Sequence, residues 1–408
     1  MGQNALRNGV CIFLICIILC AAGSSLAEEL TEGIRFGVFS IHPSMYTALR
    51  YDDNVYFVPN NYRPENERSI PQDIESDMVL NVMPAITFNL TWPTFLAKVG
   101  YRFYNDTYLG LNDPDNRHDD LNATNHNYSG LLDYNAPFGL MVGARDDYSI
   151  METYEDTEEF ADYLRGSQTH NEGSGWLGYR HGPEDNLFIR AAYTNILDQY
   201  DEYDEFNKMG QFVDGELRLK FFPLTALVAQ GGYGIIDYDS IQAYDSTNWW
   251  AKGGLQGQIT THLIMTIKGG WAAADYQENE DLGDWLADAE LTAMFPSQTQ
   301  LTGGYRHYWR DATNTNFFVT HEGYLRFTRL WGSRLLTSAF GSYQYNDFSE
   351  PLPRHEDFVQ GNVDVTFRFV YWLFIGGGYK IEHKLYDDDD IRETSTRNVA
   401  LIHLQAQF

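Results

Sequence analysis

The sequence predicts an all-β protein, a transmembrane antiparallel β barrel of about 18 strands with short periplasmic turns and long acidic extracellular loops. Three observations predict this class. Long segments alternate between apolar and polar residues, turn signals recur about every 40 residues, and the chain ends on Phe408. Because a strand points successive side chains to opposite faces, alternation gives each strand an apolar face for lipid and a polar face for a lumen.

The first element is a signal peptide over residues 1–27. Arg7 precedes the apolar run "VCIFLICIILCAAG", and "SLA" at 25–27 is a small-x-small cleavage site before Glu28. An uncleaved anchor and a lipoprotein modified at Cys20 are the alternatives. Residues 28–42 are expected to form a short periplasmic lead-in, and residues 43–408 the barrel. All three cysteines lie within residues 1–27, so the mature chain is expected to fold without disulfides.

Charge and composition exclude two other classes of protein. A formal net charge of −29 argues against a nucleic-acid-binding protein, because phosphate backbones attract basic surfaces. The chain also contains 28 Tyr, 25 Phe and 9 Trp residues, and acidic disordered chains are poor in aromatic residues. The composition therefore indicates a folded protein.

Alternation and turn signals predict the strands and join them in hairpins. The predicted ranges are 43–57, 77–91, 94–108, 124–135, 138–150, 170–180, 186–198, 207–221, 225–237, 247–259, 263–275, 284–295, 298–309, 317–330, 333–346, 357–370, 371–386 and 394–408. A β propeller also repeats about every 40 residues, but its blades need four short strands per repeat. The segment "NVDVTFRF" (362–369) shows the expected alternation, and the glycines in "GGYG" (231–234) and "GGG" (376–378) indicate bends or close strand approaches.

The polar positions of this alternation place basic side chains along the predicted lumen. We expect them to form the transport path, since lumen charges tune selectivity; the alternative is that they pair across strands and fill the lumen. These residues are Lys98, Arg102, Arg190, Arg218, Lys220, Lys252, Lys268, Arg306, Arg326, Arg368, Lys380 and Lys384. Aromatic residues at the rim, such as Trp249, Tyr305 and Tyr308, would either stack on sugars or form the interfacial girdle.

The predicted loops hold most of the acidic residues and few of the basic ones, for example "EDTEEFAD" (155–162) and "DDDD" (387–390). A solvated rim is one interpretation, and Ca²⁺ or Mg²⁺ bridging to lipopolysaccharide is the other. No motif predicts a metal site or a cofactor, and we expect no enzyme activity. A barrel-borne hydrolase is the remaining alternative, with His118 beside Asp119 or His355 beside Glu356 as its polar pair.

Two segments near the start resemble the outer-membrane β-barrel porin 2 family: "PSMYTALRYDDNVYFVP" (43–59) and "SDMVLNVMPAITFNL" (76–90). The "YDDN" at 51–54 and the closing Phe408 are the matching features. The resemblance covers the mature chain by pattern, and it implies an exopolysaccharide-associated barrel in the bacterial outer membrane.

The resemblance implies a channel that passes a hydrophilic solute, in particular a conduit for exopolysaccharide export. The implied partners are outer-membrane lipid and lipopolysaccharide, the barrel assembly machinery and a periplasmic polysaccharide-export protein, without nucleic acid. A C-terminal strand ending in Phe is the assembly signal of such barrels, and Ile402, Leu404 and Phe408 fit it. A structural or adhesive barrel with a blocked lumen is the alternative from another class.

Overall fold

The computed structural model describes residues 33–57, 74–110, 118, 121–155, 164–182, 185–201, 207–239, 245–277, 281–312, 315–349, 353–388 and 391–408. The predicted signal peptide lies outside these residues. Among the described residues, no helix is long and apolar enough to cross a membrane.

Nearly all of the described chain is strand. The strands are β1 Ile34–Phe36, β2 Phe39–Asp52, β3 Asp77–Trp92, β4 Phe95–Tyr108, β5 Ala123–Asn135, β6 Leu140–Glu155, β7 Leu164–His181, β8 Leu187–Tyr200, β9 Lys208–Phe222, β10 Thr225–Tyr238, β11 Ser246–Thr260, β12 Leu263–Tyr276, β13 Leu282–Phe295, β14 Thr299–Asp311, β15 Phe317–Trp331, β16 Leu335–Phe348, β17 Arg354–Val370, β18 Leu373–Asp388 and β19 Ile391–Gln407.

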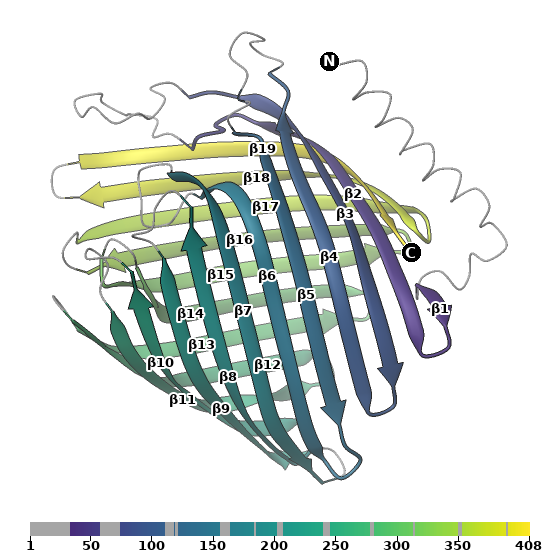
Figure 1. Ribbon diagram of the computed structural model, residues 1–408, viewed down its shortest axis with the longest axis vertical. Helices are drawn as coiled ribbons and strands as arrows, with labels where there is room; N and C mark the ends of the chain where they lie inside the picture. Colours follow the sequence, from purple (N-terminus) through teal and green to yellow (C-terminus); the bar gives the residue numbers. More distant parts are fainter. Residues whose placement is uncertain are drawn as a thin grey trace.

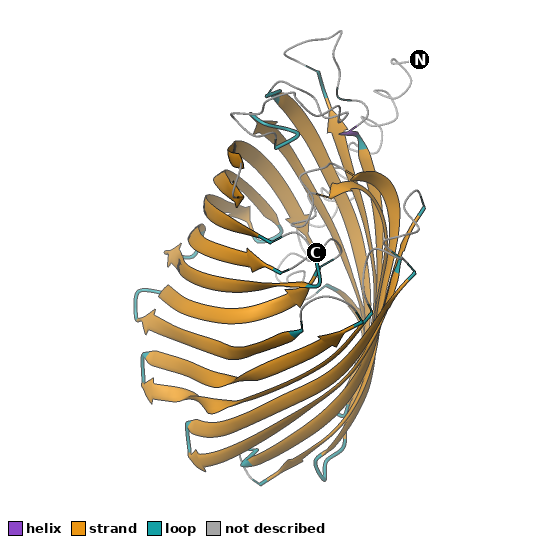
Figure 2. Ribbon diagram, turned by 90° about the vertical axis from the view of Figure 1, so that its left-hand side faces the viewer, coloured by secondary structure: helices purple, strands orange, loops and turns teal. Residues whose placement is uncertain are grey.

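Strands β2 to β19 form a closed antiparallel barrel of 18 strands, as the sequence predicts. Each strand pairs with the next along the chain, and the ring closes where β19 pairs with β2 (Figure 1). The strands curve into one wall (Figure 2). Closure gives every strand of the ring a partner on each side along much of its length, which an open sheet in lipid cannot do. We call the end with the tight turns, such as Pro93–Thr94, the turn end, and the opposite end the loop end.

The first barrel strand differs most from its predicted range of 43–57. It begins at Phe39, because the short strand β1 pairs with residues Phe39–Ile41 through a turn at Gly37, whose φ is +64°. Pro43 lies between Ile41, opposite the first residue of β1, and Ser44, opposite the last residue of β19, so its missing N–H costs no bond to either strand. The strand ends at Asp52, where the backbone turns toward the β19 edge.

The two faces of the wall have opposite chemistry. Large apolar side chains cover one face; Val99, Leu325 and Ile402 are 61, 55 and 64% exposed. On the other face, side chains two strands apart meet, as expected of a concave surface: Tyr324 on β15 donates to Glu290 on β13 at 2.6 Å. The apolar face is therefore the outer face, and the polar face lines the lumen.

A charge on the outer face should destabilise the barrel, whereas the same charge one residue away should not. Ile267 is 50% exposed on the outer face of β12, and Thr266 faces the lumen opposite Glu290. In lipid, Ile267→Arg is expected to cost about 2–4 kcal/mol and Thr266→Arg much less. Unfolding by denaturant in lipid vesicles measures both, and equal losses would contradict the assignment of faces.

The ladder between β13 and β14 is interrupted toward the loop end. It pairs Phe295 with Thr299 at one end and Ala287 with His307 at the other. Beyond that point the rest of β13 pairs only with β12, and the rest of β14 only with β15. The two parts of the wall are thus free to lie at different depths.

Beyond this interruption the wall overlaps itself. By alternation, Asp311 belongs to the outer face of β14. It nevertheless accepts hydrogen bonds from Ser246 (3.0 Å) and Tyr276 (2.7 Å), which belong to the inner face of β11 and β12. The Phe317 ring stacks on Tyr276 at 5.7 Å. The resulting apolar layer consists of Ala272, Ala274, Tyr276, Leu282, Leu286 and Phe317, flanked by Trp250, Trp309 and Val319. The tip of the β14–β15 hairpin therefore lies inside the β11–β13 wall, and we call this region the overlap.

Candidate functional site: the barrel lumen

Strand register places the predicted basic residues on the lumen face. Lys98 precedes the outer residue Val99, Arg218 lies between the outer residues Leu217 and Leu219, and Lys380 follows the outer residue Tyr379. The same alternation holds for Arg102, Arg190, Lys220, Lys252, Lys268, Arg306, Arg326, Arg368 and Lys384. Their role in transport stays a prediction.

Near the loop end the lumen charges are buried and paired. Asp52 is fully buried, and the Arg397 guanidinium donates to both of its carboxylate oxygens, from Nε at 3.1 and 3.0 Å. Lys384 lies 3.4 Å from the buried Glu356, and Arg50 lies 3.4 Å from Asp106. These pairs link β2 to β19, β17 to β18 and β2 to β4, so they stiffen this part of the wall.

Between the paired zone and the turn end, the pairing is incomplete. Lys268 binds Asp288 at 2.9 Å and Arg306 lies 3.7 Å from Glu322. Six other residues of the predicted basic set form no ion pair with any carboxylate that the structure describes: Lys98, Arg102, Arg190, Lys252, Arg326 and Arg368. These residues carry positive charge that no described carboxylate pairs with, and an anion in the lumen would be attracted to them.

Several aromatic rings on the lumen face each occupy the space beside a glycine of the neighbouring strand. A Cβ atom at Gly143 would lie 2.1 Å from the Trp176 ring, and one at Gly232 would lie 2.5 Å from the Trp250 ring. Each ring belongs to the residue paired directly with its glycine; the pairs are Trp176–Gly143, Trp250–Gly232, Tyr324–Gly304, Phe212–Gly234 and His403–Gly376. Several of the mid-strand glycines thus make room for rings, which gives the predicted close approaches a specific form.

Basic side chains lie beside several of these rings. The guanidinium carbon of Arg190 is 6.0 Å from the centre of the Trp176 ring, and that of Arg306 is 4.9 Å from the Tyr324 ring. The ammonium of Lys252 is 5.7 Å from the Trp250 ring. These distances allow cation–π attraction. The sequence shows the glycines, but only the register shows which ring each of them accepts.

The rim aromatics divide between the two faces. Trp249 and Tyr305 are 47 and 38% exposed, and by alternation they belong to the apolar outer face. They therefore lie on the outer face, as the girdle interpretation requires. Tyr308 alternates with the lumen face, and its ring lies 5.2 Å from the guanidinium carbon of Arg310.

The structure describes both residues of only one of the two pairs in the hydrolase alternative, His355 and Glu356. His355 and Glu356 occupy opposite faces of β17; His355 lies 3.1 Å from Asp347, whereas Glu356 pairs with Lys384. His118 lies in the connection between β4 and β5, and its predicted partner Asp119 is outside the described residues. It is a buried histidine rather than a surface one, with Glu75 Oε2 at 2.5 Å and Asp77 Oδ2 at 2.9 Å.

The carboxylates around His118 determine its titration. Burial alone would lower its pKa, but hydrogen bonds to Asp77 and Glu75 stabilise the charged ring and raise the pKa above 6.5. A raised pKa contributes stability that is present below pH 6.5 and is lost as the pH rises through the folded-state pKa. We expect the melting temperature of the wild type to exceed that of His118→Gln at pH 6, with the gap shrinking toward pH 9. A constant gap in thermal unfolding would contradict this role of the ion pairs.

The C-terminal residues take two positions. Ile402 and Leu404 alternate on the outer face, opposite Leu49 and Thr47 of β2. The Phe408 ring stacks on Trp372 with centroids 5.3 Å apart, and its N–H donates to the Pro43 carbonyl. This arrangement anchors the chain end at the turn end; its use as an assembly signal stays a prediction.

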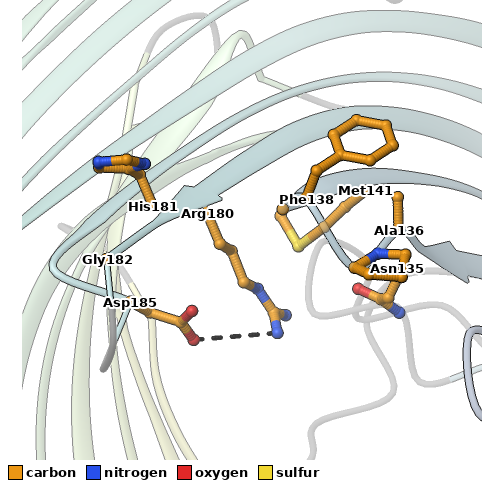
Figure 3. A pocket seen from close by; sticks show the side chains of 10 residues that line it. Asn135, Ala136, Phe138, Met141, Arg180, His181, Gly182 and Asp185 are labelled. Atoms are coloured by element: carbon orange, nitrogen blue, oxygen red, sulfur yellow. Dashed lines mark ion pairs between the residues drawn. The ribbon is translucent and has the colours of Figure 1, made fainter.

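A cavity of about 430 Å³ lies at the turn end, between the β5–β6 and β7–β8 turns (Figure 3). Its lining combines the exposed Phe138 with Arg180, which lies 3.9 Å from Asp185. Gly139 joins the two turns by accepting a hydrogen bond from the Arg180 N–H at 2.8 Å. Its φ of +99° favours glycine, and a Cβ there would lie 2.0 Å from the Arg180 carbonyl oxygen.

The acidic loops that were considered for binding Ca²⁺ or Mg²⁺ lie largely outside the described residues, including most of 155–162 and the end of 387–390. Among the residues that the structure describes, no group of three His, Cys, Asp or Glu side chains has the spacing to hold a metal ion.

Together, the strand pairing and the apolar outer face define a closed β barrel of the outer-membrane type. No family model matches the chain, and no curated protein matches it, so the porin 2 resemblance stays a prediction. Among solved structures, the chain is similar to the siderophore receptor PirA from Pseudomonas aeruginosa, with 8% identity, a TM-score of 0.46 and coverage of 90% of this chain and 80% of that one.

Two other structures are similar at the same level. The FrpB iron transporter from Neisseria meningitidis has 6% identity and a TM-score of 0.47, with 94% of this chain and 83% of that one covered. The alcaligin outer membrane receptor FauA from Bordetella pertussis has 11% identity and a TM-score of 0.43, with 90 and 76% covered. Similarity this low says nothing of what this chain binds.

Proposed function

We propose that this barrel is an outer-membrane channel for a hydrophilic anion, and that its solute is an exopolysaccharide leaving the cell. The turn end then faces the periplasm, where an export protein would deliver the polymer, and the acidic loop end faces the outside. One observation carries the proposal: the lumen wall presents basic side chains, such as Lys98, Arg102 and Arg326, that no described carboxylate neutralises.

Two further features support a channel. A barrel of this strand number is wide enough to enclose an aqueous passage. Lumen side chains reach that space; Arg145 and Arg306 are 62 and 48% exposed. The choice of a polysaccharide as the solute rests on the resemblance of residues 43–59 and 76–90 to the porin 2 family. No catalytic step is part of the proposal.

Planar bilayers test the channel directly. Purified protein should conduct, prefer chloride over potassium in a salt gradient, and lose that preference when Lys98, Arg102 and Arg326 are changed to Gln together. A triple change of outer-face residues Val99, Phe103 and Leu325 to Ala is the matched control. Absence of conductance would refute the channel, and deletion of the gene without loss of secreted polysaccharide would refute the choice of solute.

A further inference from the structure

We propose that the lumen wall carries binding stations for acidic sugar residues. Each station consists of an aromatic ring laid over a glycine, with a basic side chain beside the ring and no carboxylate paired with that base. The inference rests on the proposed function, because it names the kind of polymer that the channel would pass.

The first station is Trp176 on β7 with Gly143 and Arg190. Trp176 pairs directly with Gly143, whose missing side chain leaves the space that the indole occupies on the lumen side of the wall. Arg190 lies 6.0 Å from the ring centre. Arg190 forms no ion pair with a described carboxylate, so the charge of its guanidinium is available to an anionic ligand.

The second station repeats these elements on β10 and β11. Trp250 pairs directly with Gly232 and covers it, and the Lys252 ammonium lies 5.7 Å from the ring centre. Lys252 has no carboxylate within ion-pair distance among the described residues.

A third ring shows what distinguishes a station. Tyr324 also covers a glycine, Gly304, and has Arg306 beside it. Here, however, the tyrosine hydroxyl donates to Glu290 at 2.6 Å, and Arg306 lies 3.7 Å from Glu322. The local carboxylates already satisfy this cation, so an incoming anion gains least there.

The chemistry of a station selects its ligand. The polarised C–H face of a pyranose ring packs on the negative face of an aromatic ring. A carboxylate on the same sugar can accept from the guanidinium or ammonium at its edge, in a charge-assisted hydrogen bond. A uronic acid combines both groups in one residue, a neutral sugar lacks the carboxylate, and a small inorganic anion lacks the pyranose face. A polymer of uronic acids can therefore move between stations without leaving the wall.

The test compares tri-galacturonate with neutral maltotriose, using current block in planar bilayers and calorimetric titration of the detergent-solubilised barrel. We expect tri-galacturonate to block and bind the wild type at concentrations at least tenfold below maltotriose. Trp176→Leu and Arg190→Gln should each weaken tri-galacturonate about tenfold, whereas Trp249→Leu, on the outer face beside Trp250, should not. Gly143→Ala keeps both ligand groups but displaces the ring, and it should weaken binding as well.

The outcomes separate the stations from the channel. Equal block by the two sugars, or unchanged tri-galacturonate binding in Arg190→Gln, would overturn the stations while the channel stands. If no current flows but titration shows tri-galacturonate binding that Trp176→Leu removes, the stations stand and the proposed channel fails. Titration of the wild type without any heat of binding to tri-galacturonate would overturn the stations regardless of the current.

Discussion

Replacing Asp52 with alanine is expected to destabilise the barrel more than any other single change of a lumen charge. Asp52 has no exposed surface, and Arg397 donates to both of its oxygens across the β2–β19 closure. Without the carboxylate, Arg397 would remain largely buried and poorly compensated, at a cost of about 3–5 kcal/mol. Thermal unfolding in detergent and the heat-dependent shift in gel mobility measure the loss of closed barrel.

The matched control is Asp147→Ala. Asp147 also pairs with an arginine, Arg145, on the lumen face, but that arginine is 62% exposed. Exposed pairs contribute about 0–1 kcal/mol, so this variant should unfold close to the wild type. Similar losses in both variants would show that burial at the closure does not matter.

The second large effect is expected from Phe317→Ala in the overlap. Phe317 is buried, stacks on Tyr276 and joins the apolar layer between the β14–β15 tip and the β11–β13 wall. Removing a buried phenylalanine ring typically costs about 3–5 kcal/mol. Denaturant unfolding should show this loss, whereas Phe138→Ala, a turn residue that is 68% exposed, should change little. If the two variants unfold alike, the overlap does not contribute to stability.

Alternation and turn chemistry are local properties, which is why the strands could be predicted closely. The range 94–108 corresponds to β4 at Phe95–Tyr108, because "WPT" marks the turn and the alternation that follows is regular. The start of β7 was misplaced: the strand begins at Leu164 rather than 170. Residues 164–169 carry few apolar side chains, so their pairing with β6 leaves no periodic signal.

The features that depend on register could not be predicted. Trp176 and Gly143 are 33 residues apart in the sequence. Neither residue alone indicates that the ring of one covers the other. The overlap is also invisible to alternation. Trp309 and Phe317 follow the outer-face pattern, yet they pack on inner-face residues of another part of the wall. Alternation along a strand assigns each side chain to a face of that strand. It does not show that one part of the barrel wall lies inside another.

Because the ring closes only when β19 pairs with β2, a chain that lacks its last strand cannot form the closed barrel. Arg397 of β19 contacts Asp52 of β2, which lies 345 residues earlier in the chain. A ribosome that stops early releases a chain with two unpaired sheet edges, and unpaired edges invite aggregation and degradation. Only a chain translated through its final strand can seal itself, so truncated products should be recognised by their open edges before they reach a membrane.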